Sequence, residues 1–154
     1  MSLIETSKSS FPTSTRISKT EYEVLAEFRF ALRQFTSFSD AAIEEVGLTP
    51  QRHQALLAIQ GFPGREQITI GELAERLQIK HHSAVGLVNR LEADGLIDRS
   101  TAPNDRRKVL IALSQRGLSI LEKLSNSHRE ELRQLSPQLR LLLERITKLS
   151  ERGN

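Results

Sequence analysis

Residues 69–113 read TIGELAERLQIKHHSAVGLVNRLEADGLIDRSTAPNDRRKVLIAL. Thr69 and Glu72 have the spacing of a capping box, which predicts the start of a short helix. Apolar residues at steps of three and four then predict a second helix from about His81 to Gly95. Two short helices separated by so few residues are typical of a helix-turn-helix.

A β-hairpin is predicted directly after the second helix. Residues 96–100 and 108–113 have the composition of strands, and Pro103-Asn104-Asp105 supplies the turn. We expect the loop to be longer than a tight two-residue turn and to project as a wing. The chain is therefore predicted to be mainly α-helical with a small β-wing, and its winged helix-turn-helix core is predicted over about residues 48–113.

Long helices are predicted on both sides of this core, over about residues 19–46 and 114–150. Ser136-Pro137 repeats the signal of a capping residue followed by proline, so we expect it to open a separate last helix rich in leucine. The apolar stripe of the first segment comprises Leu25, Phe28, Leu32, Phe35, Ala42 and Val46. Because further apolar residues lie off this stripe, we expect both segments to be dimerisation helices; packing within one chain is the alternative.

Length and composition bound the domain organisation. Residues 1–18 hold nine serines and threonines, and we expect them to form a disordered N-terminal arm. Residues 19–154 have the length of a single domain.

Several classes of function are disfavoured by composition. The chain has no cysteine, which excludes disulfides, thiolate metal sites and thiol redox sensing. No apolar run is long enough to span a membrane and no signal-peptide core follows the N-terminus, so the expected location is the cytoplasm. The four histidines lack metal-ligand spacing, and catalytic carboxylate pairs and glycine-rich phosphate loops are missing, so we expect no metal, no cofactor and no enzyme.

The charge is unevenly distributed, although the net charge is only +3. Residues 76–116 hold eight bases against four acids, whereas residues 21–45 hold six acids against two bases. A basic zone on one part of a near-neutral chain is typical of a phosphate-binding face.

The second helix of the pair is predicted to present an outward face with few charges, opposite Ala84, Leu87, Val88 and Leu91. Such a face suits close approach to base edges, because Asn89 can donate and accept hydrogen bonds and Gly86 adds no bulk. An ordinary solvated helix is the alternative. The candidate DNA-binding residues of this helix are His81, His82, Ser83, Val85, Gly86, Asn89 and Arg90.

The predicted hairpin carries basic residues at or beside its tip. The candidate DNA-binding residues of this wing are Asp105, Arg106, Arg107 and Lys108. One arginine can enter a narrow minor groove, while the other is held by Asp105 or by a phosphate. The alternative is an ordinary charged hairpin, but the helix pair directly before it favours a DNA-binding wing.

With its parts in this order, the chain resembles the MarR (multiple antibiotic resistance regulator) family of bacterial transcriptional regulators over about residues 20–150. The segments that carry the resemblance are GLTPQRHQALLAI (47–59), IGELAERLQI (70–79), LVNRLEADGLIDR (87–99) and NDRRKVLIALSQRG (104–117). By position, the resemblance implies that His81 to Arg90 form the recognition helix and that Asp105, Arg106 and Arg107 belong to the wing.

The resemblance also implies a homodimer whose first and last helices interlock and whose two winged lobes grip one pseudo-palindromic operator. It implies repression that is relieved by a small anionic, often phenolic, ligand or by a redox signal. The peroxide-sensing branch of the family is excluded because the chain has no cysteine. The pair His81-His82 replaces more usual small polar residues, so the bases that are read do not follow from relatives.

A candidate effector pocket is expected between the first helix and the winged lobe. Arg29, Arg33 and His53 are the cationic or switchable groups near that junction, and each could receive a carboxylate or phenolate. Ion pairing of these groups to Glu27, Glu44 or Glu45 is the alternative.

The sequence thus predicts a sequence-specific transcriptional regulator that binds double-stranded DNA as a homodimeric repressor. A small-molecule effector is a candidate partner, and no membrane partner is expected. The alternative is a winged-helix protein-interaction module that binds DNA only weakly, which a salt titration on random duplex would distinguish.

Overall fold

The computed structural model describes residues 16–151, apart from the side chain of Ser150. Most of the predicted N-terminal arm, residues 1–15, lies outside the described residues. The chain divides into two compact units, one of residues 34–134 and one that pairs the N-terminal segment up to Arg33 with the C-terminal segment from Leu135. That residues 19–154 behave as one domain stays a prediction.

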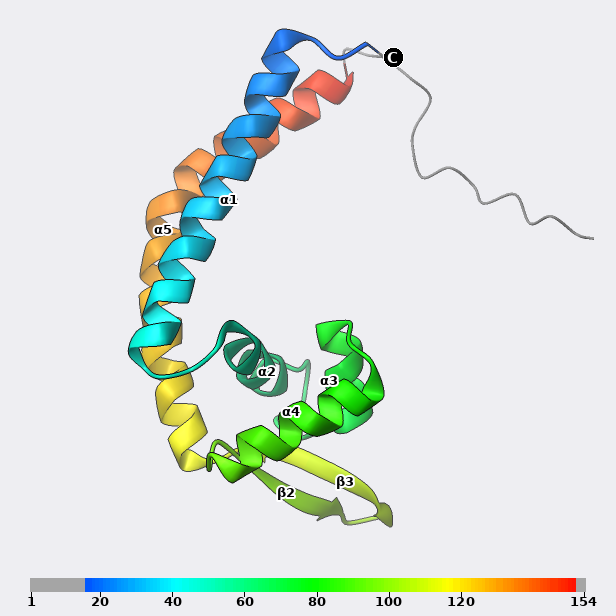
Figure 1. Cartoon of the computed structure of the whole chain (residues 1–154). Helices are drawn as coiled ribbons and strands as arrows, with labels where there is room; N and C mark the ends of the chain where they lie inside the picture. The colour runs from blue at the N-terminus through cyan, green and yellow to red at the C-terminus, as the bar shows by residue number, and fades with distance from the viewer. Residues whose placement is uncertain (1–15, 152–154) are drawn as a thin grey trace, which may run out of the picture. The chain divides into compact units, whose positions relative to one another are not determined.

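The described residues form five helices and three strands, in the order α1 (Lys19–Glu45), α2 (Pro50–Gln60), β1 (Ile68–Thr69), α3 (Ile70–Leu77), α4 (His81–Ala93), β2 (Ile97–Ala102), β3 (Asp105–Leu113) and α5 (Gln115–Glu151) (Figure 1). This is the predicted winged helix-turn-helix: α3 and α4 form the helix pair, and β2 and β3 form the wing. The prediction of a mainly helical fold with a small β-wing is confirmed.

The three strands form an antiparallel sheet in the order β1-β3-β2. Ala102 pairs with Asp105, so Pro103 and Asn104 alone form the turn. The expectation of a longer loop was therefore wrong: β3 begins at Asp105, and the basic residues that follow it lie in the strand. The register shifts between Thr101 and Ala102. Because of this irregularity, the residues of β3 that have no partner in β2 lie within the strand and not in the loop.

The core of the 34–134 unit is formed where α2, α3, α4 and the sheet meet. Leu56, Leu73, Leu87 and Ile111 are among its fully buried residues. The four predicted inward residues of α4 are all buried. The hydrophobic periodicity of the sequence therefore fixes how α4 is rotated about its own axis.

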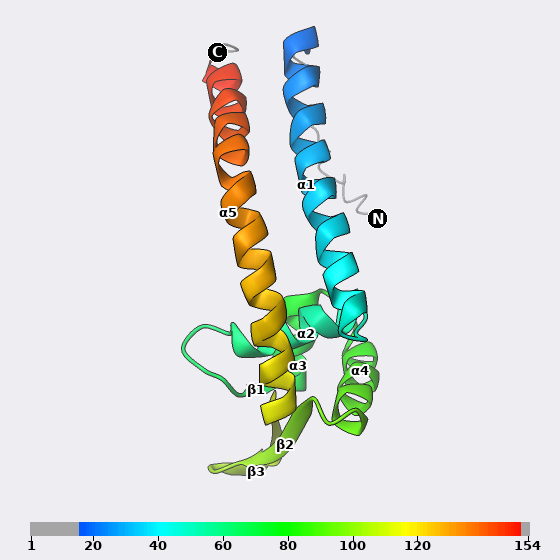
Figure 2. The same cartoon turned by 90° about the vertical axis from the view of Figure 1, so that its left-hand side faces the viewer.

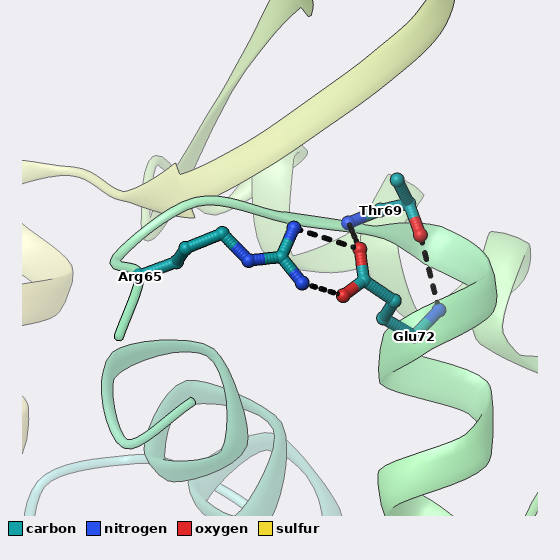
Figure 3. Close-up of polar contacts among 3 residues, drawn as sticks. All are labelled: Arg65, Thr69 and Glu72. Atoms are coloured by element: carbon teal, nitrogen blue, oxygen red, sulfur yellow. Dashed lines mark hydrogen bonds and ion pairs between the residues drawn. The ribbon is translucent and has the colours of Figure 1, made fainter. Parts of the chain in front are cut away.

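The start of α3 is fixed by the predicted capping box (Figure 3). The backbone N–H of Glu72 donates to the Thr69 hydroxyl at 3.1 Å, and the Glu72 carboxylate accepts from the Thr69 N–H at 3.1 Å. Arg65 also donates two hydrogen bonds to the same carboxylate. The predicted cap of α2 is confirmed as well, because the Thr49 side chain accepts from the Arg52 N–H and Pro50 is the first helical residue.

The start of α5 is attached to the α4–β2 connection. The hydroxyl of Ser114 donates to the Gly95 carbonyl at 2.6 Å and accepts from the Gly117 N–H at 3.0 Å. A Cβ atom at Gly117 would lie 2.0 Å from the carbonyl oxygen of Leu96, so only glycine fits at this close approach.

The smaller unit is a pair of helical segments, the first part of α1 and the last part of α5 (Figure 2). Val24, Ala31 and Leu142 are buried between them, with Phe28 partly buried. Leu25 and Leu32, which belong to the predicted apolar stripe, are 48% and 42% exposed. Val24 and Ala31, each one residue earlier, are fully buried.

The predicted break at Ser136-Pro137 was also wrong, because α5 runs through Pro137 without interruption. A proline inside a helix removes one backbone hydrogen bond, but it does not prevent the helix from continuing when neighbouring residues hold it. Leu139, Leu142 and Ile146 provide this anchoring by packing on α1. Among the described helices, none combines the length and apolar character needed to cross a membrane.

Candidate nucleic-acid interface

The outward face of α4 is exposed as predicted. His81, His82, Ser83, Asn89 and Arg90 are exposed, and Val85 and Gly86 are partly exposed. Lys80 precedes the helix without a capping hydrogen bond from its side chain. The first-turn N–H groups of α4 are therefore not capped by that side chain, and such groups attract phosphate oxygens.

Asn89 is joined to the wing by a residue that the sequence did not single out. Arg99, on β2, donates from Nη2 to the Asn89 Oδ1 atom, and its Nε atom lies 3.2 Å from the Glu92 carboxylate. Arg99 thus links two residues of α4 to the hairpin, as the close packing of α4 on β2 allows (Figure 1). Because the Asn89 oxygen is occupied, its NH₂ group is the part left to donate to a base-edge acceptor.

The wing arginines differ in how they are held. The Asp105 carboxylate accepts from the backbone N–H of Arg107 at 3.0 Å and from its Nε atom at 3.4 Å. The Arg107 side chain is nevertheless 93% exposed, and Arg106 and Lys108 are exposed too. The sequence did not decide whether Asp105 holds Arg106 or Arg107. In the structure it holds Arg107.

The three candidate effector residues are not in one unit. Arg29 and Arg33 are exposed in the smaller unit, whereas His53 is buried in the 34–134 unit. The alternative is not observed either: within residues 16–151 no ion pair joins any of the three to Glu27, Glu44 or Glu45.

His53 packs instead against His128, which sequence reasoning passed over. The rings lie 5.0 Å apart between centroids at 76°, and Phe35 and Phe38 lie edge-on to His128. Both histidines are more than nine-tenths buried, and neither Nε2 atom has a hydrogen-bond partner. Only the i, i+3 spacing of Phe35 and Phe38 hinted at this cluster, because the contact between α2 and α5 joins residues 75 positions apart.

Burial sets the protonation of this pair. Loss of hydration lowers the pKa of His53, and the nearby His128 lowers it further. Burial also lowers the pKa of His128, although a hydrogen bond to the backbone carbonyl of Ser39 opposes this. Both rings are therefore neutral at neutral pH.

The described residues contain no group of three or more histidine, cysteine, aspartate or glutamate side chains that could hold a metal ion. The exposed edge of α4, joined through Arg99 to a basic hairpin, is the arrangement of a winged helix-turn-helix DNA-binding protein.

Comparisons with known proteins agree with this class. The model of the MarR family matches residues 46–108, which span α2 to the basic part of β3. The match covers less than half of the chain, and together with the fold it supports a winged-helix regulator of the MarR family.

Two curated relatives match most of the chain. The organic hydroperoxide resistance transcriptional regulator of Bacillus subtilis is 28% identical over 74% of this chain and 82% of its own length. The HTH-type transcriptional repressor NicR of Pseudomonas putida is 27% identical over 77% of this chain and 75% of its own length. Their names agree with the predicted class of transcriptional regulator.

A solved structure of a mutant of S. aureus MepR bound to an oligodeoxyribonucleotide has a TM-score of 0.64 with this chain. The match covers 90% of this chain and 100% of the solved one, at 21% identity. This likeness supports the fold.

Proposed function

We propose that the chain is a homodimeric repressor that reads a pseudo-palindromic operator with α4 and grips it with the wing. The observation that carries this proposal is the exposed face of α4, which Arg99 joins to the hairpin that also carries the exposed arginines of β3. Asn89 would donate to a base in the major groove, and His82 would reach a purine edge. Arg90 and Ser83 would contact phosphates.

The wing would occupy the neighbouring minor groove. Arg107 is the better of the two arginines for this role, because Asp105 restricts its rotamers before DNA arrives. A side chain that is already oriented loses less conformational entropy on binding. Arg106 and Lys108 would supply charge to the flanking phosphates.

The proposal of a dimer is supported by the smaller unit. Tyr22, Leu25, Leu141 and Leu143 are between 48% and 61% exposed on its two helices, which is unusual for a surface that meets only water. A second copy of the chain would cover them. Two α4 helices would then lie about one DNA turn apart, roughly 34 Å.

Repression and release by a ligand complete the proposal. Relatives of the chain include a named repressor, the Pseudomonas putida protein NicR. Arg29, Arg33 and His53 remain proposed effector contacts, although the burial of His53 leaves it little access to a ligand.

Selection from a random duplex pool tests the proposal directly. A repressor of this design should enrich an inverted repeat with half-site centres about 10 base pairs apart. Sedimentation should show a dimer at the concentrations that bind DNA. Enrichment of no motif, with affinity that disappears at moderate salt, would instead favour the protein-interaction alternative.

A further inference from the structure

The exposed face of α4 changes in hydrogen-bonding character along the helix. His82 and Ser83, near its start, each carry a side chain that can both donate and accept. In the C-terminal half of this face, the exposed polar side chains are those of Asn89, Arg90 and Glu92. The side-chain acceptors of this half are therefore the Asn89 amide oxygen and the Glu92 carboxylate.

Arg99 of β2 engages both of these acceptors. Its Nη2 atom donates to the Asn89 Oδ1 atom, and its Nε atom lies 3.2 Å from the Glu92 carboxylate. The contact also fixes how the Asn89 amide is turned, because a guanidinium has only donors and must meet the amide oxygen. The NH₂ group of Asn89 is therefore the end that is available to a base.

Arg90 adds only donors to the same half of the face. A Cβ atom at Gly86 would lie 3.5 Å from the Arg90 Nη1 atom, so the guanidinium reaches back by one turn and lies beside Gly86. A guanidinium carries five N–H donors and no acceptor. The surroundings of Asn89 are therefore rich in donors, and both nearby acceptors are already held by Arg99.

Base edges in the major groove differ in the order of their donors and acceptors. Guanine presents two neighbouring acceptors, N7 and O6, whereas adenine places its N6 donor beside N7. An asparagine with an unrestrained amide bonds to adenine at both ends. The Asn89 oxygen keeps a second lone pair, but an adenine N6 donor that used it would approach the positively charged Arg99 guanidinium. A guanine edge meets donors alone and avoids this repulsion.

We infer that Arg99 is a specificity-determining residue that makes Asn89 select guanine over adenine. Arg99 acts through the orientation of the Asn89 amide, so it is a positioning residue and needs no contact with a base. Arg90 reinforces the same preference because it brings further donors. The inference rests on the proposed function, because it requires that this face of α4 enters the major groove.

The test begins with the motif that the original chain selects from a random duplex pool. The base pair read by Asn89 is the one at which Asn89→Ala loses preference. A G·C pair should stand there, and replacing its guanine by adenine, paired with thymine, should weaken binding at least about tenfold. Hypoxanthine keeps both N7 and O6, so an operator that carries it opposite cytosine should bind like the guanine operator.

Arg99→Met removes the donors and keeps a long side chain. It should reduce the ratio of guanine to adenine affinity from about tenfold to about threefold or less, because the Asn89 amide can then turn and bond to adenine. A lost phosphate contact or a weakened fold would lower both affinities together and leave the ratio unchanged. Arg99→Lys keeps a donor for the Asn89 oxygen and should retain most of the ratio.

Arg76→Met is the matched control. Arg76 is also an exposed arginine, but its guanidinium carbon lies 4.8 Å from the centre of the Phe62 ring, and this variant should keep the original ratio. The double variant Asn89→Ala/Arg99→Met tests whether the effect passes through Asn89. It should gain no more affinity for the adenine operator, relative to the guanine operator, than Asn89→Ala alone.

Three results would overturn the inference while the proposed function stands: an A·T pair at the position that depends on Asn89, an unchanged ratio in Arg99→Met, or an equal change in Arg76→Met. Weak binding of the hypoxanthine operator would also overturn it, because guanine and hypoxanthine differ only in the minor groove. If the pool yields no motif, the proposed function fails and the inference fails with it.

Discussion

The chain carries two pairs of histidines in opposite surroundings. His81 and His82 open α4 and are exposed, whereas His53 and His128 pack against each other inside the 34–134 unit. The first pair can exchange hydrogen bonds with water or DNA, and the second pair has two ring nitrogens without any partner. The same residue type is thus exposed in one place, where we propose that it contacts DNA, and packed in the core in the other.

The largest expected effect is on stability. His128→Ala should lower the free energy of unfolding by about 2–4 kcal/mol, because a buried ring is replaced by a cavity. His82→Ala is the matched control and should change the same quantity by no more than about 0.5 kcal/mol. Urea denaturation measures both, and equal losses for the two variants would contradict the contrast between the pairs.

A somewhat smaller effect is expected on DNA affinity. Arg107→Ala should weaken binding to every sequence by about 1–3 kcal/mol and should flatten the salt dependence, since a charged contact is lost. Asp105→Asn should cause a smaller loss, because Arg107 keeps its charge but loses its orientation. Mobility shifts at several salt concentrations would show whether Arg106→Ala matters more, which would reverse the roles proposed for the two arginines.

Asn89 should affect preference between sequences more than total affinity. Asn89→Ala should reduce the free energy of discrimination by about 1–2 kcal/mol at particular base pairs. This is less than a full bidentate contact would contribute, because the Asn89 oxygen already accepts a hydrogen bond from Arg99. Arg99→Gln should alter preference at the same positions. If Asn89→Ala lowered affinity uniformly on a panel of single-base operator variants, Asn89 would be contacting phosphate.

The smallest expected effect concerns pH. Because burial lowers the pKa of His53 and His128 below the ordinary value of 6.5, the unfolded chain takes up protons before the folded chain does. The contribution of this pair is therefore complete above about pH 6.5 and declines as the pH falls below it.

Phe35 and Phe38 lie edge-on to His128, and the hydrogen bond to the backbone carbonyl of Ser39 opposes the effect of burial on its pKa. Melting temperatures from pH 7.5 to about pH 5 should fall less steeply in a His53→Leu/His128→Leu variant. A His81→Gln/His82→Gln variant should keep the original slope. An unchanged slope in the leucine variant would show that other groups cause the acid sensitivity.

Local signals in the sequence predicted much of this fold. The inward face of α4 and the caps of α2 and α3 depend on residues within four positions of one another, so periodicity and cap chemistry are enough to find them. The bounds of the wing were less predictable, because strand pairing extends β3 to Asp105 and leaves a two-residue turn. The prediction of a helix break at Pro137 was wrong for a similar reason. Packing of α5 on α1 overrides the local preference for a break.

The sequence predicted which residues are exposed at the candidate interface, but it did not predict the contacts between their side chains. Exposure of the α4 face follows from the helical wheel, yet the contact of Arg99 with Asn89 joins a strand to a helix through the fold. The pairing of His53 with His128 spans 75 positions and leaves no local pattern. Contacts of this kind are set by tertiary packing.

The close approach at Gly117 affects how a genetic screen on this regulator would be interpreted. Any replacement there drives a side chain into the Leu96 carbonyl and forces the first turn of α5 away from the α4–β2 connection. If the chain is the proposed repressor, cells carrying such alleles would look derepressed because they contain little intact protein, and immunoblotting would reveal the shortage. Alleles at Arg107 should give the same phenotype at normal abundance.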